Sequence, residues 1–153
     1  MKKLSLILFS LSILFFTNYS QTEEKLIYGK AKVIDGDTII INNEKIRFGG
    51  IDSPERKEIG YELSKQKLKE KLNKNIVNCI REKNKDRWGR TVAECFINGK
   101  SLSSFMVKNG YACDYVKYSK KKYAKEEEYA KSKKLGIWKM KFSPSWEKKC
   151  RKK

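Results

Sequence analysis

Four short segments of this chain combine carboxylates with arginines in a pattern that could hydrolyse a phosphodiester. They read IDGDT at residues 34–38, IRF at 46–48, IDSPE at 51–55 and DRWGR at 86–90, each at the end of an apolar, strand-like run. Carboxylates can hold a hard cation and position water, whereas guanidinium groups can bind phosphate through paired hydrogen bonds. Hydrolysis of a phosphodiester requires this combination of groups.

In this order and at these separations, the four segments resemble the thermonuclease, or staphylococcal nuclease-like, family from about residue 25 to about residue 138. Each segment alone occurs by chance in many proteins. The resemblance implies a calcium-dependent, sugar-nonspecific nuclease that hydrolyses DNA and RNA, with single-stranded or frayed substrates favoured. It further implies in-line attack by water, no covalent enzyme intermediate and 3′-phosphorylated products.

By this resemblance, Asp37 and Asp52 are the expected ligands of a calcium ion, Ca2+, together with the backbone carbonyl of Ser53, where the family usually has threonine. Calcium accepts about six to eight oxygen ligands in irregular geometry, so two carboxylates, a carbonyl and waters can suffice. Either aspartate could instead be a turn residue that accepts backbone N–H groups. The sequence contains no histidine, which excludes imidazole-based zinc sites and histidine-dependent hydrolysis within it.

Arg47, Glu55 and Arg90 match the positions of the family's catalytic residues. The resemblance assigns Glu55 as the general base or orienter of the attacking water, and both arginines as ligands of the scissile phosphate. Planar guanidinium groups suit the charge of a pentacoordinate transition state, and lysine would not reproduce their geometry. The open alternatives are a surface acid at Glu55 and structural salt bridges at the arginines, with Asp86 as the evident partner of Arg90.

Aromatic residues near these segments could line a nucleotide pocket or belong to the core. In the family, tyrosines at the positions of Tyr115 and Tyr118 line the pocket, where a ring can stack on any base. Core packing is the alternative for both. We expect Trp88 and Trp138 in the core, and Asp86 as a structural brace of its loop.

The start of the chain has the composition of a secretory signal peptide. Lys2 and Lys3 precede a mostly apolar run over residues 4–16, which is shorter than the roughly 20 residues of a membrane span. An uncleaved N-terminal anchor is the alternative, and the cleavage site is left open. We therefore expect an exported protein, secreted or periplasmic, without stable membrane insertion once the signal is removed.

The expected organisation is a signal peptide at residues 1–20, a nuclease domain at 25–140 and a basic C-terminal tail at 141–153. The sequence has 36 lysines and arginines against 18 acids, a formal net charge of +18. Signal removal would take away two lysines and lower this charge to +16. Such an excess favours a polyanionic partner, either nucleic acid or an anionic membrane surface. We expect a monomer that binds DNA and RNA.

Four cysteines in an exported chain suggest disulfides. Cys79 and Cys95 lie on neighbouring expected strands, which favours that pair. Cys113 and Cys150 would then form a second disulfide that ties the tail to the domain. Three pairings are possible in principle, and the sequence alone does not choose among them.

The hydrophobic pattern predicts an α+β fold that is mainly a β-barrel. The expected elements are strands at 25–34, 37–41 and 45–51, a helix at 61–74, strands at 76–80 and 91–97, and helices at 101–110 and 123–134. Asn42 and Asn43 make a good turn between the second and third strands, because asparagine tolerates positive φ. This order fits a five-stranded OB-type barrel with three helices, and the family resemblance implies the same fold.

Two rival functions come from other classes of protein. A catalytically inactive OB-type nucleic-acid-binding protein would have the same fold, but binding a polyanion does not require a set of acids at the site. A cationic surface protein would explain the charge but leaves the acid–arginine set unexplained, and no basic amphipathic helix with a bulky apolar face is evident. The pattern therefore favours the nuclease.

Overall fold

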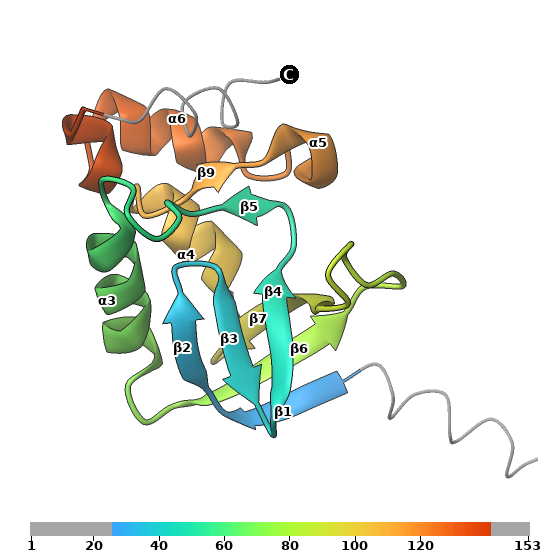
Figure 1. Cartoon of the computed structure of the whole chain (residues 1–153). Helices are drawn as coiled ribbons and strands as arrows, with labels where there is room; N and C mark the ends of the chain where they lie inside the picture. Colours follow the sequence, from blue (N-terminus) through green and yellow to red (C-terminus); the bar gives the residue numbers. More distant parts are fainter. Residues whose placement is uncertain (1–25, 142–153) are drawn as a thin grey trace, which may run out of the picture.

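A computed structural model describes residues 26–141 as a strongly curved sheet with helices packed around one end (Figure 1). The strands are β1 (Leu26–Lys30), β2 (Lys32–Asp35), β3 (Thr38–Ile41), β4 (Glu44–Phe48), β5 (Ile51–Asp52), β6 (Ile76–Arg81), β7 (Thr91–Ile97), β8 (Lys100–Ser101) and β9 (Cys113–Asp114). The helices are α3 (Tyr61–Leu72), α4 (Leu102–Lys108), α5 (Val116–Ser119) and α6 (Ala124–Ser132), followed by the 3-10 helix η1 (Gly136–Lys139).

The main sheet closes on itself. Its strand order is β1-β6-β7-β4-β3-β2, so β1 and β2 lie at opposite ends of the hydrogen-bonded path. Only Ala31 separates these two strands in the chain, and the two ends must therefore meet. The pairs are antiparallel except for β4 with β7, which run parallel. Counting β1 and β2 as one bent strand gives the predicted five-stranded, OB-type barrel.

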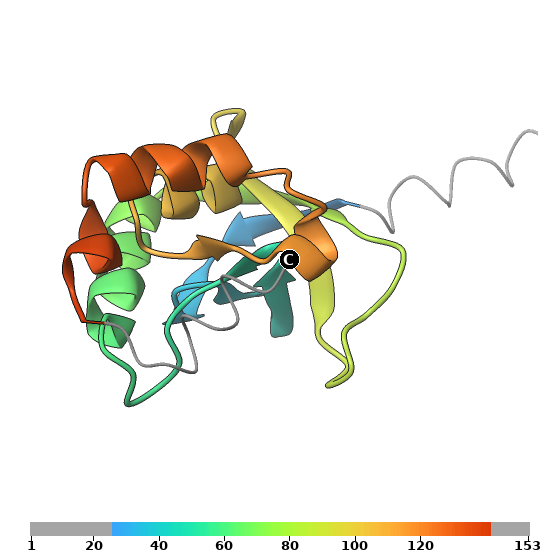
Figure 2. The same cartoon turned by 90° about the horizontal axis from the view of Figure 1, so that it is seen from above.

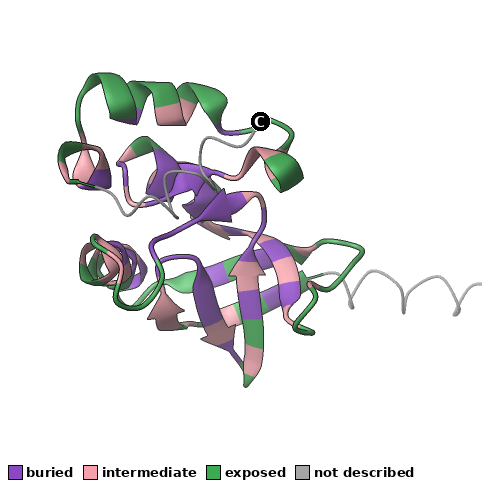
Figure 3. Ribbon diagram, turned by 45° about the horizontal axis from the view of Figure 1, so that its top comes forward, coloured by how far each residue is buried: buried purple, intermediate pink, exposed green. Residues whose placement is uncertain are grey.

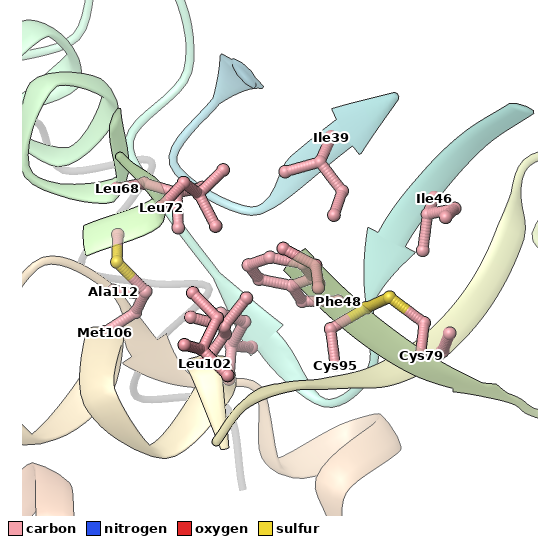
Figure 4. Close-up of a cluster of buried hydrophobic side chains, with 14 of the residues drawn as sticks. Ile39, Ile46, Phe48, Leu68, Leu72, Cys79, Cys95, Leu102, Met106 and Ala112 are labelled. Carbon is pink, nitrogen blue, oxygen red and sulfur yellow. A yellow bond between two sulfur atoms is a disulfide. The ribbon is translucent and has the colours of Figure 1, made fainter. Parts of the chain in front are cut away.

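The barrel encloses one apolar core because its strands alternate inward and outward side chains. In β7, every second residue from Thr91 to Ile97 is buried. Phe48 lies at the centre of the cluster, and α3 and α4 cover the open end with Leu68 and Met106 (Figure 4).

The predicted Cys79–Cys95 disulfide is present and borders this core (Figure 4). The two residues are directly paired across β6 and β7, with their Cα atoms 4.0 Å apart. Cys113 is fully buried in β9 and is not a free thiol. Its predicted pairing with Cys150 lies outside the described residues, as do the expected signal peptide and nearly all of the basic tail.

The helices form a layer on one side of the barrel. Seen from above, α4 and α6 lie side by side, and α3 stands next to them (Figure 2). α4 is largely buried between the barrel and α6, whereas the outer face of α6 is exposed (Figure 3). Within residues 26–141, no helix has the length and apolar composition needed to span a bilayer.

The structure also contains short elements that the sequence pattern did not predict. The prediction of one strand over 45–51 is wrong, because β4 ends at Phe48 and a turn at residues 49–50 separates it from β5. The two-residue strands β5 and β9 form a separate sheet, with Asp52 paired to Cys113. β8, α5 and η1 were likewise not expected. The predicted turn at Asn42 and Asn43 is present, with φ values of 49° and 66°. The β5–β9 pair matters most, because it places the 51–55 segment against the helical layer.

Candidate active site

Three barrel elements bring Asp37, Arg47 and Asp52 together. Asp37 immediately precedes β3, and its neighbour Thr38 pairs in register with Arg47 on β4. Arg47 Nη2 donates to Asp52 Oδ1 at 2.9 Å and to the carbonyl of Ile51 at 3.1 Å. The other terminal nitrogen, Nη1, forms an ion pair with Asp37 Oδ1. A single guanidinium group therefore bridges two carboxylates, one from the β2–β3 turn and one from β5.

The 51–55 segment is fixed against the β2–β3 turn. The backbone N–H of Ser53 donates to Asp37 Oδ2 at 2.9 Å. Gly36 allows this close approach, because an added Cβ would lie 2.8 Å from the Ser53 Cβ and 2.7 Å from the Ser64 Cβ. The glycine of the IDGDT segment therefore has a packing role: it lets the turn contact both α3 and the loop that carries Ser53.

Both aspartates are almost completely removed from water, with 2% of Asp37 and 3% of Asp52 exposed. Burial alone raises the pKa of Asp37, but the charge of Arg47 and the Ser53 N–H more than offset this and hold the pKa below its usual value. Burial opposes the charged form of Arg47, whereas the two carboxylates raise its pKa further above its ordinary value. The ion pair with Arg47 thus favours the ionised form of Asp37 in the interior.

A third acid, Asp35, lies beside this cluster. Its Oδ1 accepts the backbone N–H of Asp37 at 3.3 Å. Burial and the negative charge of Asp37 raise the pKa of Asp35 to about 6. One arginine thus faces more carboxylate charge than it can neutralise, and the local potential is negative.

Arg90 reaches the same cluster from the β6–β7 loop through one hydroxyl group. Its Nη1 donates to Thr38 Oγ1 at 3.4 Å, and Thr38 Oγ1 donates to Asp37 Oδ1 at 3.0 Å. Asp86 holds the arginine in place by accepting from Arg90 Nε at 2.6 Å and from the Arg90 backbone N–H at 2.9 Å. The predicted bracing role of Asp86 agrees with these contacts. Thr38, which links the two arginine sites, was missed by the sequence analysis.

The donor set around Asp37 and Asp52 fits a hard cation with several water ligands. Both groups offer carboxylate oxygens, and a divalent ion would offset the negative charge of the neighbouring carboxylates. Within residues 26–141, no three acidic or cysteine side chains converge closely enough to hold a metal ion by themselves. A cation at Asp37 and Asp52 would need water or carbonyl oxygens as further ligands.

The structure does not bring Glu55 into contact with this cluster. Its side chain is exposed in the loop after β5, and its backbone N–H donates to Glu58 Oε2 at 2.7 Å. In the described part of the chain, no hydrogen bond or ion pair joins the Glu55 carboxylate to Asp37, Arg47 or Asp52. Glu55 is thus close in sequence to Asp52, with a carboxylate that is accessible to water.

The two predicted tyrosines belong to one short helix that packs near β5: Tyr115 is the N-cap of α5, and Tyr118 lies within it. The Tyr115 N–H donates to the Gly50 carbonyl at 2.9 Å, which attaches α5 to the chain just before β5. The rings of Tyr115 and Tyr118 make an edge-to-face contact, with centroids 4.9 Å apart. Tyr118 is 63% exposed and so is not a core residue, whereas Tyr115 is half-buried.

The prediction that Trp88 lies in the core is wrong, because 64% of the residue is exposed. Asp86 accepts the backbone N–H groups of both Trp88 and Arg90 at 2.9 Å, and Gly89 follows at a φ of 76°. This tight turn directs the indole outward, where the Arg87 guanidinium lies 3.9 Å from the ring centroid. Trp138 is partly buried and packs against a small cluster with Cys113 and Ile137.

Comparison with known proteins gives a consistent result. Residues 45–140 match the family model described as staphylococcal nuclease homologue. The chain is 32% identical to the succinoglycan biosynthesis protein ExoI of Rhizobium meliloti, over 84% of this chain and 72% of that protein. It is 31% identical to an uncharacterized endonuclease of Haemophilus influenzae, over 87% and 78% of the two chains. It is also 36% identical to the staphylococcal-like nuclease CAN1 of Arabidopsis thaliana, over 67% of this chain and 32% of that one.

Replacing Arg47 with glutamine should strongly destabilise the metal-free protein. The change leaves two buried carboxylates without their cation, which typically costs about 3–5 kcal/mol. The measurement is urea unfolding at pH 7 with a chelator. Arg81→Gln is the matched control: its ion pair with Glu44 is about one-third exposed on both sides, so the loss should be about 1 kcal/mol or less. Equal losses in the two variants would contradict the bridging role of Arg47.

Asp35→Asn should stabilise the metal-free protein at pH 8 and have little effect at pH 4. Because the pKa of Asp35 is raised in the folded protein, stability is lost as the pH rises from the ordinary aspartate pKa through about 6. Asparagine does not ionise and so removes that loss. Solvent screens this partly buried group, so we expect a gain of about 1 kcal/mol. Thermal unfolding with a chelator at both pH values measures the effect.

Asp86→Asn provides a control of opposite sign. Although burial opposes ionisation, hydrogen bonds from Arg90 and Trp88 lower the pKa of Asp86. Its contribution to stability is therefore present above the unfolded pKa and lost as the pH falls through the folded value. Asp86→Asn should destabilise the protein at pH 8. A gain from Asp35→Asn of equal size at pH 4 and pH 8 would show that ionisation of Asp35 is not the cause.

Proposed function

The chain belongs to the staphylococcal nuclease family, and we propose that it is a calcium-dependent nuclease that hydrolyses the phosphodiester bonds of both DNA and RNA. The single observation that carries this proposal is the bridge from Arg47 to the buried Asp37 and Asp52, with Arg90 one hydroxyl group away. Relatives named as an endonuclease and as a staphylococcal-like nuclease support the general activity.

In this proposal, Asp37, Asp52 and the carbonyl of Ser53 hold the calcium ion. The bound ion supplies positive charge at the phosphate and an ordered water shell. The negative potential at the cluster and the all-oxygen donor set support this assignment.

Arg47 and Arg90 bind the scissile phosphate and stabilise the charge that develops in the transition state. Both side chains come from rigid elements, β4 and the Asp86-braced loop, so little ordering is needed when substrate binds. Arg47 lowers the pKa of Asp37 before the ligand arrives, and its planar group can bond both to the carboxylates and to the phosphate.

Glu55 orients or deprotonates the attacking water. Its exposure to solvent is compatible with this role, because the water must enter from outside and the carboxylate has no competing ion pair in the described chain. Attack is in line, the 5′ P–O bond breaks, and the product carries a 3′-phosphate. No protein side chain is bonded covalently to the substrate at any stage.

Tyr118, with Tyr115 behind it, offers an aromatic surface at the edge of the site. Stacking on this surface accepts any base and does not require a 2′-hydroxyl, which is compatible with action on both DNA and RNA. Single-stranded or frayed substrates are favoured, because their bases are free to stack. We further propose that the protein is exported by means of residues 1–20, and the disulfide at Cys79 and Cys95 suits an oxidising compartment.

The deciding experiment tests the metal and both sugars. Purified protein should degrade single-stranded DNA and RNA in calcium, and neither substrate with a calcium chelator. Magnesium should support little activity, because it requires a tighter octahedral shell than two carboxylates and a carbonyl provide. Gel analysis of labelled oligonucleotides measures cleavage, and end analysis should find 3′-phosphates. Binding of both nucleic acids without cleavage in calcium would instead identify an inactive OB-type binder.

Replacing Glu55 with glutamine should lower kcat by about 100-fold or more while leaving the affinity for single-stranded DNA nearly unchanged. The side chain acts on water and not on the substrate, and loss of a general base typically costs at least this factor. Steady-state kinetics and DNA titration measure the two quantities. Glu62→Gln is the matched control, because Glu62 is an exposed acid in the first turn of α3. Near-normal turnover of Glu55→Gln would exclude the base role.

A further inference from the structure

A groove on the barrel lies beside the catalytic cluster and has no role in the function described so far. It has a volume of about 420 Å³ and runs between the β3–β4 turn and the β6–β7 loop, which projects beside β4 (Figure 1). Its lining includes Asn42, Lys45, Lys85 and Trp88. A second groove of about 340 Å³ adjoins it, and the two share Glu44, Lys85 and Thr91. Both are within the size range of ligand pockets, so each has room for about one nucleotide.

The charge of the two grooves is positive. Together they are lined by five basic and two acidic residues: Lys45, Arg81, Lys83, Lys85 and Arg90 against Glu44 and Glu82. Glu44 is already neutralised, because Arg81 pairs with it at 2.5 Å and Thr91 donates to it at 2.6 Å. Lys45 and Lys85 are exposed, and neither has an ion pair within residues 26–141. Their ammonium groups are therefore available to an anionic ligand.

Trp88 adds an aromatic surface to this basic groove. The ring is 64% exposed, and the guanidinium groups of Arg87 and Arg90 lie 3.9 and 4.9 Å from its centroid. An exposed indole between cationic groups suits a ligand that combines flat rings with negative charge. Single-stranded nucleic acid combines these features, because its bases stack on aromatic side chains while its phosphates pair with lysine and arginine.

Arg90 connects the groove to the catalytic cluster. The same side chain lines the groove and donates to Thr38, which contacts Asp37. A strand whose scissile phosphate lies at Arg90 can therefore continue directly into the groove. An acidic peptide could meet the lysines, but it would make no use of the indole or of this continuity.

We propose that this groove, between the β3–β4 turn and the β6–β7 loop, and the second groove that adjoins it form an extended subsite that holds about two further nucleotides of a single-stranded substrate. Lys45 and Lys85 bind backbone phosphates, and Trp88 stacks on a base. The subsite rests on the proposed nuclease function, because it takes the polymer that the catalytic cluster cleaves. It makes the enzyme prefer long substrates over dinucleotides.

The test compares two double variants that lose the same charge. The groove variant carries Lys45→Ala and Lys85→Ala. The control variant carries Lys125→Ala and Lys133→Ala, on the other side of the molecule. In calcium, the groove variant should raise KM for a 12-nucleotide single-stranded DNA about tenfold and leave KM for a dinucleotide unchanged. The control should alter neither value. Trp88→Leu should also raise KM for the 12-mer and spare the dinucleotide. Unchanged thermal unfolding will show that the exposed lysines are not needed for folding.

Direct binding separates the subsite from catalysis. Fluorescence anisotropy with labelled (dT)12 in a chelator should show weaker binding by the groove variant. The slope of log K against log salt should be smaller by about 1.4, the value for two lost contacts to single strands. If the wild type cleaved no substrate, the nuclease function would be refuted. The binding measurement would still show whether the groove binds single-stranded DNA.

Three results would overturn the subsite. One is that the groove variant binds (dT)12 as tightly as the wild type and has the same KM for the 12-mer. Another is an equal rise in KM for the dinucleotide, which would place the lysines at the catalytic cluster. The third is an equal loss of affinity for labelled polyglutamate, which would identify a general surface for acidic proteins.

Discussion

The structure of the site depends on one guanidinium group that lies between two buried carboxylates. Asp37 lies in the β2–β3 turn and Asp52 in β5, and ionised acids in the interior would repel each other and lose hydration. Arg47 compensates both effects and also bonds to the carbonyl of Ile51, so β4 fixes the position of the β5 segment. The same contact that joins β4 to β5 therefore favours the ionised form of the buried Asp37 and holds the two carboxylates together.

Small elements that contribute little to the core set the position of the site. The β5–β9 pair joins Asp52 to Cys113, and the Tyr115 N–H anchors α5 to Gly50. These contacts connect the barrel to the helical layer at the point where the acids lie. Gly36 completes the arrangement by letting the β2–β3 turn pack directly on Ser53 and Ser64. The barrel supplies rigidity, and these short contacts give the 51–55 segment a single conformation.

The features that follow from residue periodicity were predictable. Strand alternation placed Arg47 on the side opposite Ile46 and Phe48, and paired strands brought Cys79 to Cys95. β5 and β9 have two residues each, which is too short for any period to be visible. Trp88 was misplaced because the turn that exposes it depends on hydrogen bonds to Asp86. Thr38 was missed because a lone threonine in a strand is an ordinary strand former, and only the tertiary contact with Arg90 shows its connection to the site.

The protein is basic as a whole but acidic at the cluster around Asp37, and these two charges act on a ligand at different distances. The chain as a whole is strongly basic, at +18, whereas the cluster around Asp37 is acidic, and burial together with the charge of Asp37 raises the pKa of Asp35 to about 6. A polyanion farther away than the Debye length, about 8–10 Å, is attracted by the basic surface. At that distance salt screens the charges of the acids around Asp37, and Arg47 bridges two of these acids. At contact, the same acids repel phosphate unless a divalent cation lies between them. In the proposed mechanism, a basic exterior around an acidic centre attracts nucleic acid by its net charge, and productive placement of the scissile phosphate depends on the metal.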